Sequence, residues 1–139
     1  MEKDCQYLSW ENAPIGPLLG HAAHLARERM DVRLARYDVT PAQTHVLLYL
    51  GEQSGPTPQR DVVEHLRVKP PTANGILDRL EEKKLICRRA DPEDLRQKRV
   101  CLTEKGRELR VRLQNAFQEG AALTLHGLSE EETAVLRGL

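Results

Sequence analysis

The sequence predicts a mainly α-helical protein with one small β-hairpin. Apolar residues recur every three or four positions through most of the chain, which is the period of an amphipathic helix. Between residues 85 and 102 the period falls to two, which is the period of a strand. Aromatic residues make up only 4% of the 139 positions, so aliphatic side chains must form the core. A chain of this length can bury such a core without a disulfide or a structural metal.

Charge and hydropathy exclude several classes of protein. Lysine plus arginine number 21 and aspartate plus glutamate number 21, so the formal net charge is zero. This balance excludes a strongly basic nucleic-acid-binding tail and a broad membrane-binding surface. No apolar run approaches the ~18 residues of a transmembrane helix. Residues 1–6 lack the charged-then-apolar order of a signal peptide, so we expect a cytoplasmic protein.

The three cysteines are odd in number and unclustered. This usage fits a reduced cytosolic chain rather than a disulfide framework. Cys5 has no fixed basic neighbour that would make its thiol reactive. Cys87 and Cys101 can face each other across the predicted hairpin, where we expect small buried or half-buried side chains and no redox switch.

Residues 14–37 are expected to form a long helix. Its apolar positions recur at three- or four-residue steps, at Leu19, Ala22, Ala26, Met30, Leu34 and Tyr37. A second apolar line runs beside this stripe, at Leu18, Leu25 and Val32. The apolar face is therefore wider than one core contact needs, and a second subunit would explain the extra width.

The middle of the chain has the pattern of a helix-turn-helix. Thr40-Pro41 is an N-cap followed by proline at the first helical position. Thr57-Pro58 repeats this start signal before a second, short helix. Pro70-Pro71 can open a helix but cannot lie inside one, so residues 71–83 are expected to be the next helix. Two short helices separated by three or four residues form a helix-turn-helix.

The remaining elements follow from alternation and capping. Residues 85–89 and 98–102 are expected to be two strands, joined by the turn sequence Asp91-Pro92-Glu93-Asp94. Thr103 then caps a helix that runs to about residue 126. Ser129 begins a capping box that opens a last short helix.

One positive region stands out in this neutral chain. Residues 83–99 hold seven basic side chains and three acidic ones, a local charge of +4. Local fields, rather than the total charge, decide where a polyanion docks. The alternative interpretation is a solvated charged face, which is what most charge runs are.

A helix-turn-helix followed by a basic hairpin is suited to binding DNA. A helix about 10–12 Å across fits the major groove, and the side chains of its first two turns reach the base edges. Thr72 and Asn74 can hydrogen-bond to bases, and Arg96 at the hairpin tip is long enough to enter a minor groove. Asp94 is placed to hold the Arg96 guanidinium. The candidate DNA-binding residues are Lys69, Pro71, Thr72, Asn74, Gly75, Arg79, Asp94, Arg96, Lys98 and Arg99.

Signals of an enzyme or of a metal site are missing from the sequence. It contains no glycine-rich phosphate loop, no G-x-S-x-G and no H-E-x-x-H. His21 and His24 are close enough on one helix to share a metal, and His45 is a possible third ligand. Exposed or hydrogen-bonded histidines are the simpler interpretation. We therefore expect no catalytic residue, no metal and no cofactor.

At this point the residues from about Val39 to Gly106 resemble the MarR family of bacterial and archaeal transcription regulators. The stretch from Val39 to Gln43 is similar to the family's L-T-x-x-Q opening. Residues 77–88 resemble its L-D-R-L-E-x-K-G-L-V-x-R stretch, and Asp94, Arg96 and residues 102–106 resemble D-x-R…L-T-x-x-G. Several motifs in the correct order make the resemblance specific.

The resemblance implies a winged helix-turn-helix domain in an obligate homodimer on a pseudo-palindromic operator. It implies an N-terminal arm and dimerisation helix over residues 1–38, the winged domain over 39–103, and C-terminal dimerisation helices over 104–139. Thr72 and Asn74 match positions that read the major groove, and Asp94 and Arg96 match the wing acid and arginine. Small ligands commonly bind between the dimerisation helices and the winged domain, so we expect a repressor released by a small molecule.

The chain departs from the family pattern at a few positions, and a second hypothesis stays open. Lys69-Pro70-Pro71-Thr72 stands where the family often has Ser-x-x-Thr, and Lys84 replaces a usual glycine. Gly75 stands where a larger polar residue is common. With a neutral total charge, these changes are also compatible with a winged-helix protein-interaction module that binds DNA weakly or not at all.

Overall fold

The computed structural model describes residue 11 and residues 13–139, and in that part of the chain it contains six helices and a three-stranded sheet. In chain order the elements are α1 (Ile15–Ala35), α2 (Pro41–Glu52), β1 (Thr57–Pro58), α3 (Gln59–Leu66), α4 (Pro70–Glu82), β2 (Ile86–Ala90), β3 (Lys98–Leu102), α5 (Glu104–Thr124) and α6 (Glu130–Gly138). The predicted mainly α-helical fold with a small hairpin is confirmed. Residues 1–6, which include Cys5, lie outside the described residues.

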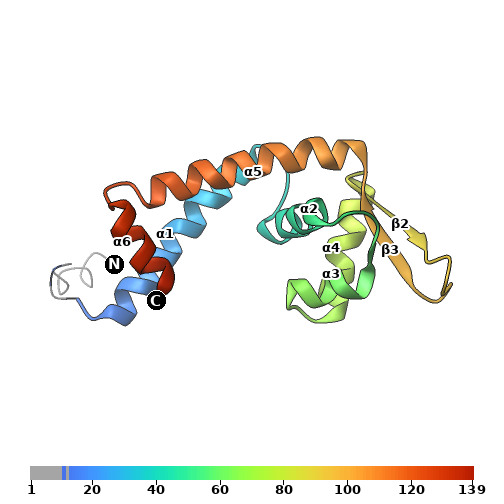
Figure 1. The fold of residues 1–139 in the computed structure, drawn as a ribbon, viewed down its shortest axis with the longest axis horizontal. Coiled ribbons are helices and arrows are strands. Elements are labelled where there is room, and N and C mark those ends of the chain that lie inside the picture. The colour runs from blue at the N-terminus through green and yellow to red at the C-terminus, as the bar shows by residue number, and fades with distance from the viewer. Residues whose placement is uncertain (1–10, 12) are drawn as a thin grey trace, which may run out of the picture.

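The elements gather at two ends of the molecule, and α5 joins them. Figure 1 shows α2, α3, α4 and the β2–β3 hairpin at one end, and α1 and α6 at the other. α5 runs from the hairpin to the far end and packs on both α2 and α1. The chain therefore separates the helix-turn-helix and its hairpin from the terminal helices.

Local capping explains where three of the helices begin. Thr40 Oγ1 accepts a hydrogen bond from the Gln43 backbone N–H at 3.2 Å, and the Gln43 side chain accepts one from the Thr40 N–H at 3.2 Å. Thr103 Oγ1 accepts from the Gly106 N–H at 3.0 Å, and Ser129 forms a capping box at the start of α6. These bonds satisfy N–H groups that have no partner inside the helix. The three predicted starts are confirmed.

Thr57-Pro58 is not a helix start, contrary to the prediction from sequence. The two residues form β1, and Thr57 pairs with Val100 of β3 in an antiparallel sheet of order β1-β3-β2. Thr57 is buried, and its hydroxyl donates to the Gly55 carbonyl instead of capping α3. Pro58 is tolerated because β1 is an edge strand, where a missing N–H costs no ladder bond.

The core lies where α2 crosses α4, α5 and the sheet. Apart from Thr44, its largest fully buried side chains are aliphatic, as the composition requires: Leu34, Val46, Leu47, Val62, Leu77, Leu80, Ile86, Val100 and Leu113. Gly106 allows α5 to begin against the backbone of residue 85, because a Cβ at Gly106 would overlap the Leu85 carbonyl oxygen. The core thereby fixes the hairpin and α4 to the first turn of α5.

The end of α4 has a left-handed residue that is not glycine. Lys84 has φ of 60°, and its N–H bonds to the Glu81 carbonyl while the Leu85 N–H bonds to the Leu80 carbonyl. This pair of bonds is the Schellman arrangement that glycine usually completes. Lys84 therefore takes the conformation of the glycine that it replaces.

Cys87 and Cys101 form a disulfide, which corrects the expectation of three reduced cysteines. They are opposite each other in the β2–β3 register, and their Cα atoms are 5.5 Å apart. That separation lies in the ordinary range for a disulfide. The predicted facing of the two cysteines across the hairpin is confirmed, whereas the odd cysteine count gave the wrong oxidation state. Among the described residues, no helix is both long and apolar enough to cross a membrane.

Candidate nucleic-acid interface

α4 presents a row of exposed positions opposite its buried face. Ala73, Leu77 and Leu80 are buried in the core, so the intervening positions point outward. The exposed positions include the predicted base-reading residues Pro71, Thr72, Asn74, Gly75 and Arg79, and Lys69 is exposed at the N-cap. A Cβ at Gly75 would meet nothing within 4 Å, so this glycine opens space on the outer surface rather than allowing a close contact.

The hairpin tip is shaped by carboxylates that accept backbone N–H groups. Asp91 Oδ1 accepts from the Glu93 N–H at 3.0 Å, and Asp94 Oδ1 accepts from the Arg96 N–H at 3.0 Å. Asp94 was expected to hold the Arg96 guanidinium, but it bonds to the Arg96 backbone instead. Arg96 is exposed, and its side chain makes no ion pair within the described residues. The turn therefore sets the position of Arg96 and leaves its guanidinium available.

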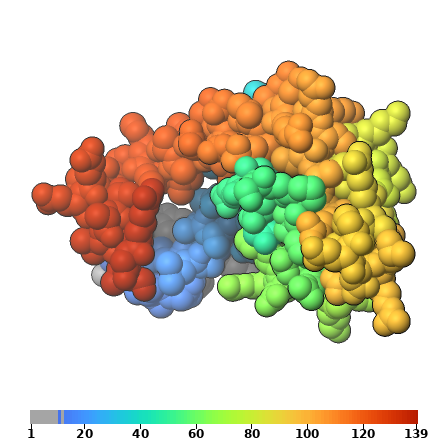
Figure 2. All heavy atoms as spheres, turned by 45° about the vertical axis from the view of Figure 1, so that its right-hand side comes forward, coloured from blue at the N-terminus to red at the C-terminus, as the bar shows by residue number. Residues whose placement is uncertain are grey.

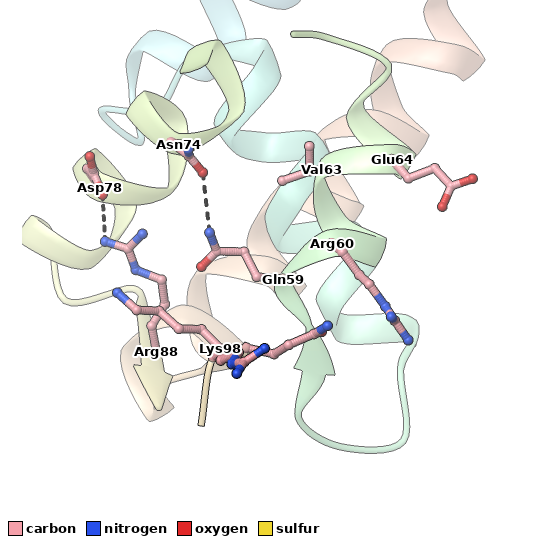
Figure 3. Close-up of a pocket in the computed structure, with 10 residues that line it drawn as sticks. Gln59, Arg60, Val63, Glu64, Asn74, Asp78, Arg88 and Lys98 are labelled. Atoms are coloured by element: carbon pink, nitrogen blue, oxygen red, sulfur yellow. Dashed lines mark hydrogen bonds and ion pairs between the residues drawn. The ribbon is translucent and has the colours of Figure 1, made fainter. Parts of the chain in front are cut away.

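A cleft of about 720 Å³ separates the helix-turn-helix from the hairpin. Asn74 lines it from α4 and Lys98 from the hairpin, as Figure 3 shows. Arg96 also lines it from the hairpin. The structure thus brings three of the predicted residues to the border of one hollow. Lys69, Pro71, Thr72, Gly75 and Arg79 lie on α4 or at its N-cap, away from this lining.

Gln59 belongs to the site and was missed from the sequence. Its Nε2 donates to Asn74 Oδ1 at 3.2 Å, as Figure 3 shows. This bond fixes the orientation of the Asn74 amide across the gap between α3 and α4. Gln59 Oε1 is buried with no partner in the described part of the chain. Gln59 opens α3 beside another polar residue, Arg60, but no motif marks either one.

Arg88 connects the hairpin to α4. Its Nε and Nη2 each lie 3.1 Å from a different oxygen of Glu81, and its Nη2 lies 2.6 Å from Asp78 Oδ1. The hydrogen bond from Arg88 lowers the pKa of Glu81, and that same bond to Glu81 raises the pKa of Arg88. Arg88 therefore holds β2 against α4, and its charge is already matched by carboxylates.

Two other basic side chains of the 83–99 region are also paired. Arg99 Nε lies 3.1 Å from Asp91 Oδ2, and Lys83 contacts Asp38. The backbone N–H of Glu93 and then the Arg99 guanidinium lower the pKa of Asp91. Within the described residues, Lys84, Arg89, Arg96 and Lys98 form no ion pair. Three of the seven basic side chains are therefore matched by carboxylates, and of the four that are not, Arg96 and Lys98 line the cleft beside α4.

The histidines considered as metal ligands do not converge. His24 of α1 pairs with Glu28 at 3.2 Å, while the ring of His45 in α2 lies 6.5 Å from that of Phe117. In residue 11 and residues 13–139, no group of three or more His, Cys, Asp or Glu side chains is placed to hold a metal ion.

Comparisons with known proteins agree on one family. Residues 37–97 match the sequence profile of the MarR family. The S. aureus MepR–DNA complex is 32% identical with a TM-score of 0.81, over 91% of this chain and 93% of that one. A MarR-family transcriptional regulator from Rhodococcus sp. RHA1 is 26% identical with a TM-score of 0.78, over 96% of this chain and 91% of that one. The regulator SlyA is 26% identical with a TM-score of 0.78, over 91% and 88%.

Proposed function

The chain belongs to the MarR family of transcription regulators, and we propose that it binds a specific double-stranded DNA sequence as a homodimer. It is a regulator and not an enzyme. The observation that carries the proposal is the joint placement of Asn74 on the exposed face of α4 and of Arg96 on the hairpin, at the border of one cleft. The resemblance to MepR, which has been solved in complex with DNA, supports it.

α4 is proposed to enter the major groove with its N-terminal half. Thr72, Asn74 and Arg79 offer hydrogen-bond donors and acceptors there, and asparagine pairs with adenine through two bonds. Gln59 already holds one face of the Asn74 amide, so Asn74 meets the base with its orientation set. Pro71 and Gly75 shape the helix surface, and Lys69 at the N-cap contacts phosphate.

The hairpin is proposed to reach the neighbouring minor groove with Arg96. A narrow A·T minor groove concentrates negative potential and attracts an arginine side chain. Lys98 is suited to a phosphate contact. Arg99 is paired with Asp91, so only its guanidinium N–H groups outside that pair are available to a phosphate. Asp94 acts through the turn, because it accepts the Arg96 backbone N–H.

The terminal helices are proposed to form the dimer, with residues 1–38 and 104–139 as the dimerising parts and 39–103 as the winged domain. Large apolar side chains are exposed on them in the single chain: Ile15, Leu19, Val32, Val111, Leu123, Val135 and Leu136. Exposed apolar area of this kind marks an interaction surface. Two joined copies place their α4 helices about one DNA turn apart, which predicts a pseudo-palindromic site.

The regulator is proposed to be a repressor that works in the cytoplasm and is released by a small molecule. A dimer that covers an operator blocks the polymerase by occupancy alone, so repression needs no further activity. Release needs a ligand that binds the free form better than the DNA-bound form. The family's usual ligand position, between the dimerising helices and the winged domain, supports this proposal.

The test is selection of DNA from a random pool by the purified full-length chain, followed by titration of the selected site at several salt concentrations. We expect a two-fold repeat with half-sites about 10 base pairs apart. Arg96→Ala should weaken binding and lower the salt slope by about one. Asn74→Ala should instead relax the preference at one position of each half-site.

Arg112→Ala is the matched control, because Arg112 is exposed on α5 and is not one of the proposed DNA contacts. Failure to retain any DNA at low salt would favour the protein-interaction module and contradict the proposal. An unchanged salt slope for Arg96→Ala would remove the hairpin contact from it.

A further inference from the structure

A second cleft lies on the face of the hairpin that points away from α4. Its volume is about 700 Å³, and it is bounded by the end of α2, the loop that follows, the β2–β3 hairpin and the first half of α5. These segments meet on the face shown in Figure 2, in green, yellow and orange. The second cleft shares no residue with the cleft beside α4.

The charged side chains that line the second cleft are all positive. Arg89, Arg107 and Arg110 line it, and no aspartate or glutamate does. In the described part of the chain these three arginines form no ion pair, unlike Arg88 and Arg99 of the same sheet. Three unmatched guanidinium groups around one hollow make a site for an anion.

The Arg110 side chain lies against the backbone of α2 at Gly51. Its Nε is buried and has no hydrogen-bond acceptor among the described residues. A Cβ on Gly51 would overlap this Nε, so only a glycine at position 51 lets the guanidinium lie against the helix. A buried donor without an acceptor costs free energy, and no described residue offsets that cost at Arg110 Nε.

The Cys87–Cys101 disulfide forms part of the wall of the second cleft. Both cysteines are half-buried, and both are among the residues that line the second cleft. Thiol–disulfide exchange requires an attacking thiolate and a cysteine that leaves as a thiolate. Positive groups near the sulfur atoms stabilise both thiolates. Arg89, Arg107 and Arg110 therefore favour the exchange for a reagent that is itself negative.

We propose that the second cleft binds a small thiol that carries a carboxylate, and that this thiol exchanges with the Cys87–Cys101 disulfide. The carboxylate meets the arginines while the thiolate attacks one cysteine sulfur. The S–S bond breaks, a mixed disulfide forms, and the other cysteine leaves as a thiolate and takes up a proton. A second thiol molecule attacks the small thiol's sulfur in the mixed disulfide. The two small thiols leave together as a disulfide, and the first cysteine leaves as a thiolate and takes up a proton. Two thiols are oxidised and two cysteine thiols are formed.

The exchange opens the covalent link between the strands that carry Arg96. It therefore connects the thiol redox state of the surroundings to the hairpin. This consequence rests on the proposed DNA-binding function. The exchange itself does not rest on that function, and the exchange is tested without DNA.

The experiment compares three small thiols on the oxidised full-length chain: anionic 3-mercaptopropionate, neutral 2-mercaptoethanol and cationic cysteamine. Alkylation quench and peptide mass spectrometry follow the opening of Cys87–Cys101. Each rate is divided by the thiolate concentration and by the rate of the same thiol with a neutral small disulfide, which removes intrinsic reactivity. We expect 3-mercaptopropionate to be at least about tenfold faster than 2-mercaptoethanol at low salt, and cysteamine to be slowest. Added salt should reduce the difference.

Variants then assign the effect to the second cleft. Arg107→Gln and Arg110→Gln should each lower the preference for the anionic thiol several-fold. Arg112→Gln, on the same helix but outside the second cleft, should retain it. Gly51→Ala should act like Arg110→Gln without changing the charge, because it displaces the guanidinium. Circular dichroism checks that each variant is folded.

Three results would overturn the proposal. The first is equal corrected rates for the three thiols on the unmodified chain, which needs no variant to fold. The second is a loss in Arg112→Gln as large as that in Arg107→Gln. The third is a chain whose Cys87 and Cys101 stay as thiols in the presence of a small disulfide.

Discussion

At the scale of single residues, the pairing of charges decides which basic groups are free to meet DNA. The Arg88 side chain is only 12% exposed and is bound to both Glu81 and Asp78. Arg89, the next residue along the same strand, points to the opposite face and has no ion pair within the described residues. Two adjacent arginines therefore have different roles, and one is a structural contact.

Replacement of Arg88 tests this difference. Arg88→Met should lower the free energy of unfolding by about 1–2 kcal/mol, because hydrogen bonds to charged groups are lost at a largely buried position. The value is at the lower end because the carboxylate partners are half exposed to water. Arg89→Met is the matched control and should change stability by less than about 0.5 kcal/mol. Urea denaturation measures both, and equal losses would contradict the structural role.

Asp91 makes the stability of the hairpin depend on pH. The Glu93 backbone N–H and the Arg99 guanidinium hold the pKa of Asp91 below its ordinary value of 3.8. A pKa that folding depresses contributes stability above the unfolded value, and that stability is lost as the pH falls through the folded value. The pKa of Glu81, lowered from 4.5 by Arg88, adds stability in the same direction.

Asp91→Asn should therefore be less stable than the unmodified chain at neutral pH, and the difference should shrink below about pH 4. Denaturant midpoints at a neutral pH, at pH 5 and at pH 3 measure it. Glu93→Gln, in the same turn and exposed, should show no such convergence. A difference that stays constant down to pH 3 would show that Asp91 acts by its shape rather than by its charge.

At the scale of elements, the residue that ends α4 has a backbone conformation that lowers the stability of the fold. Lys84 has a positive φ, and a left-handed residue with a Cβ costs about 1–2 kcal/mol relative to glycine. Lys84→Gly should therefore raise the free energy of unfolding by about 1 kcal/mol. Lys84→Ala removes the same charge and keeps the Cβ, so it should give no such gain. A thermal melt of both variants distinguishes conformation from charge.

Elements whose signals are local could be predicted, and contacts between distant positions could not. Thr40, Thr103 and Ser129 each bond to a residue three positions on, so their helix starts are written in neighbouring residues. The facing of Cys87 and Cys101 was predicted, because a local turn joins their two strands. By contrast, Thr57 becomes part of a strand only because it lies beside Val100, far along the chain. Such pairings need the folded chain.

The same division applies to the candidate interface. Helical periodicity alone placed Asn74 on the outer face of α4, because the buried positions Ala73 and Leu77 flank it. The bond from Gln59 to Asn74 joins residues 15 apart on two helices, and no local pattern announces it. The count of basic residues over 83–99 was correct. Two of them, Lys83 and Arg88, pair with carboxylates outside that segment, which a count within the segment does not include: Asp38, Asp78 and Glu81.

At the scale of the whole molecule, the terminal helices have more apolar surface than one chain covers. Leu19 of α1 is 63% exposed. Leu19→Glu should turn the proposed dimer into a monomer and abolish binding to a two-fold site while helix content is kept. Leu95→Glu is the control for the mass only, since Leu95 is 81% exposed but lies at the hairpin tip beside the proposed DNA contact Arg96. Sedimentation measures both masses, and a monomeric unmodified chain would contradict the dimer.

α5 also sets a length. Its 21 residues form a continuous helix of about 31 Å. Its first turn packs against the backbone of residue 85 beside α4, and its far end packs against α1. Tilting such a helix by about 6° moves one end by about 3 Å, close to the 3.4 Å rise of one base pair. In the proposed dimer, a small change in the angle between the two subunits is therefore enough to move α4 by about one base-pair step along the DNA.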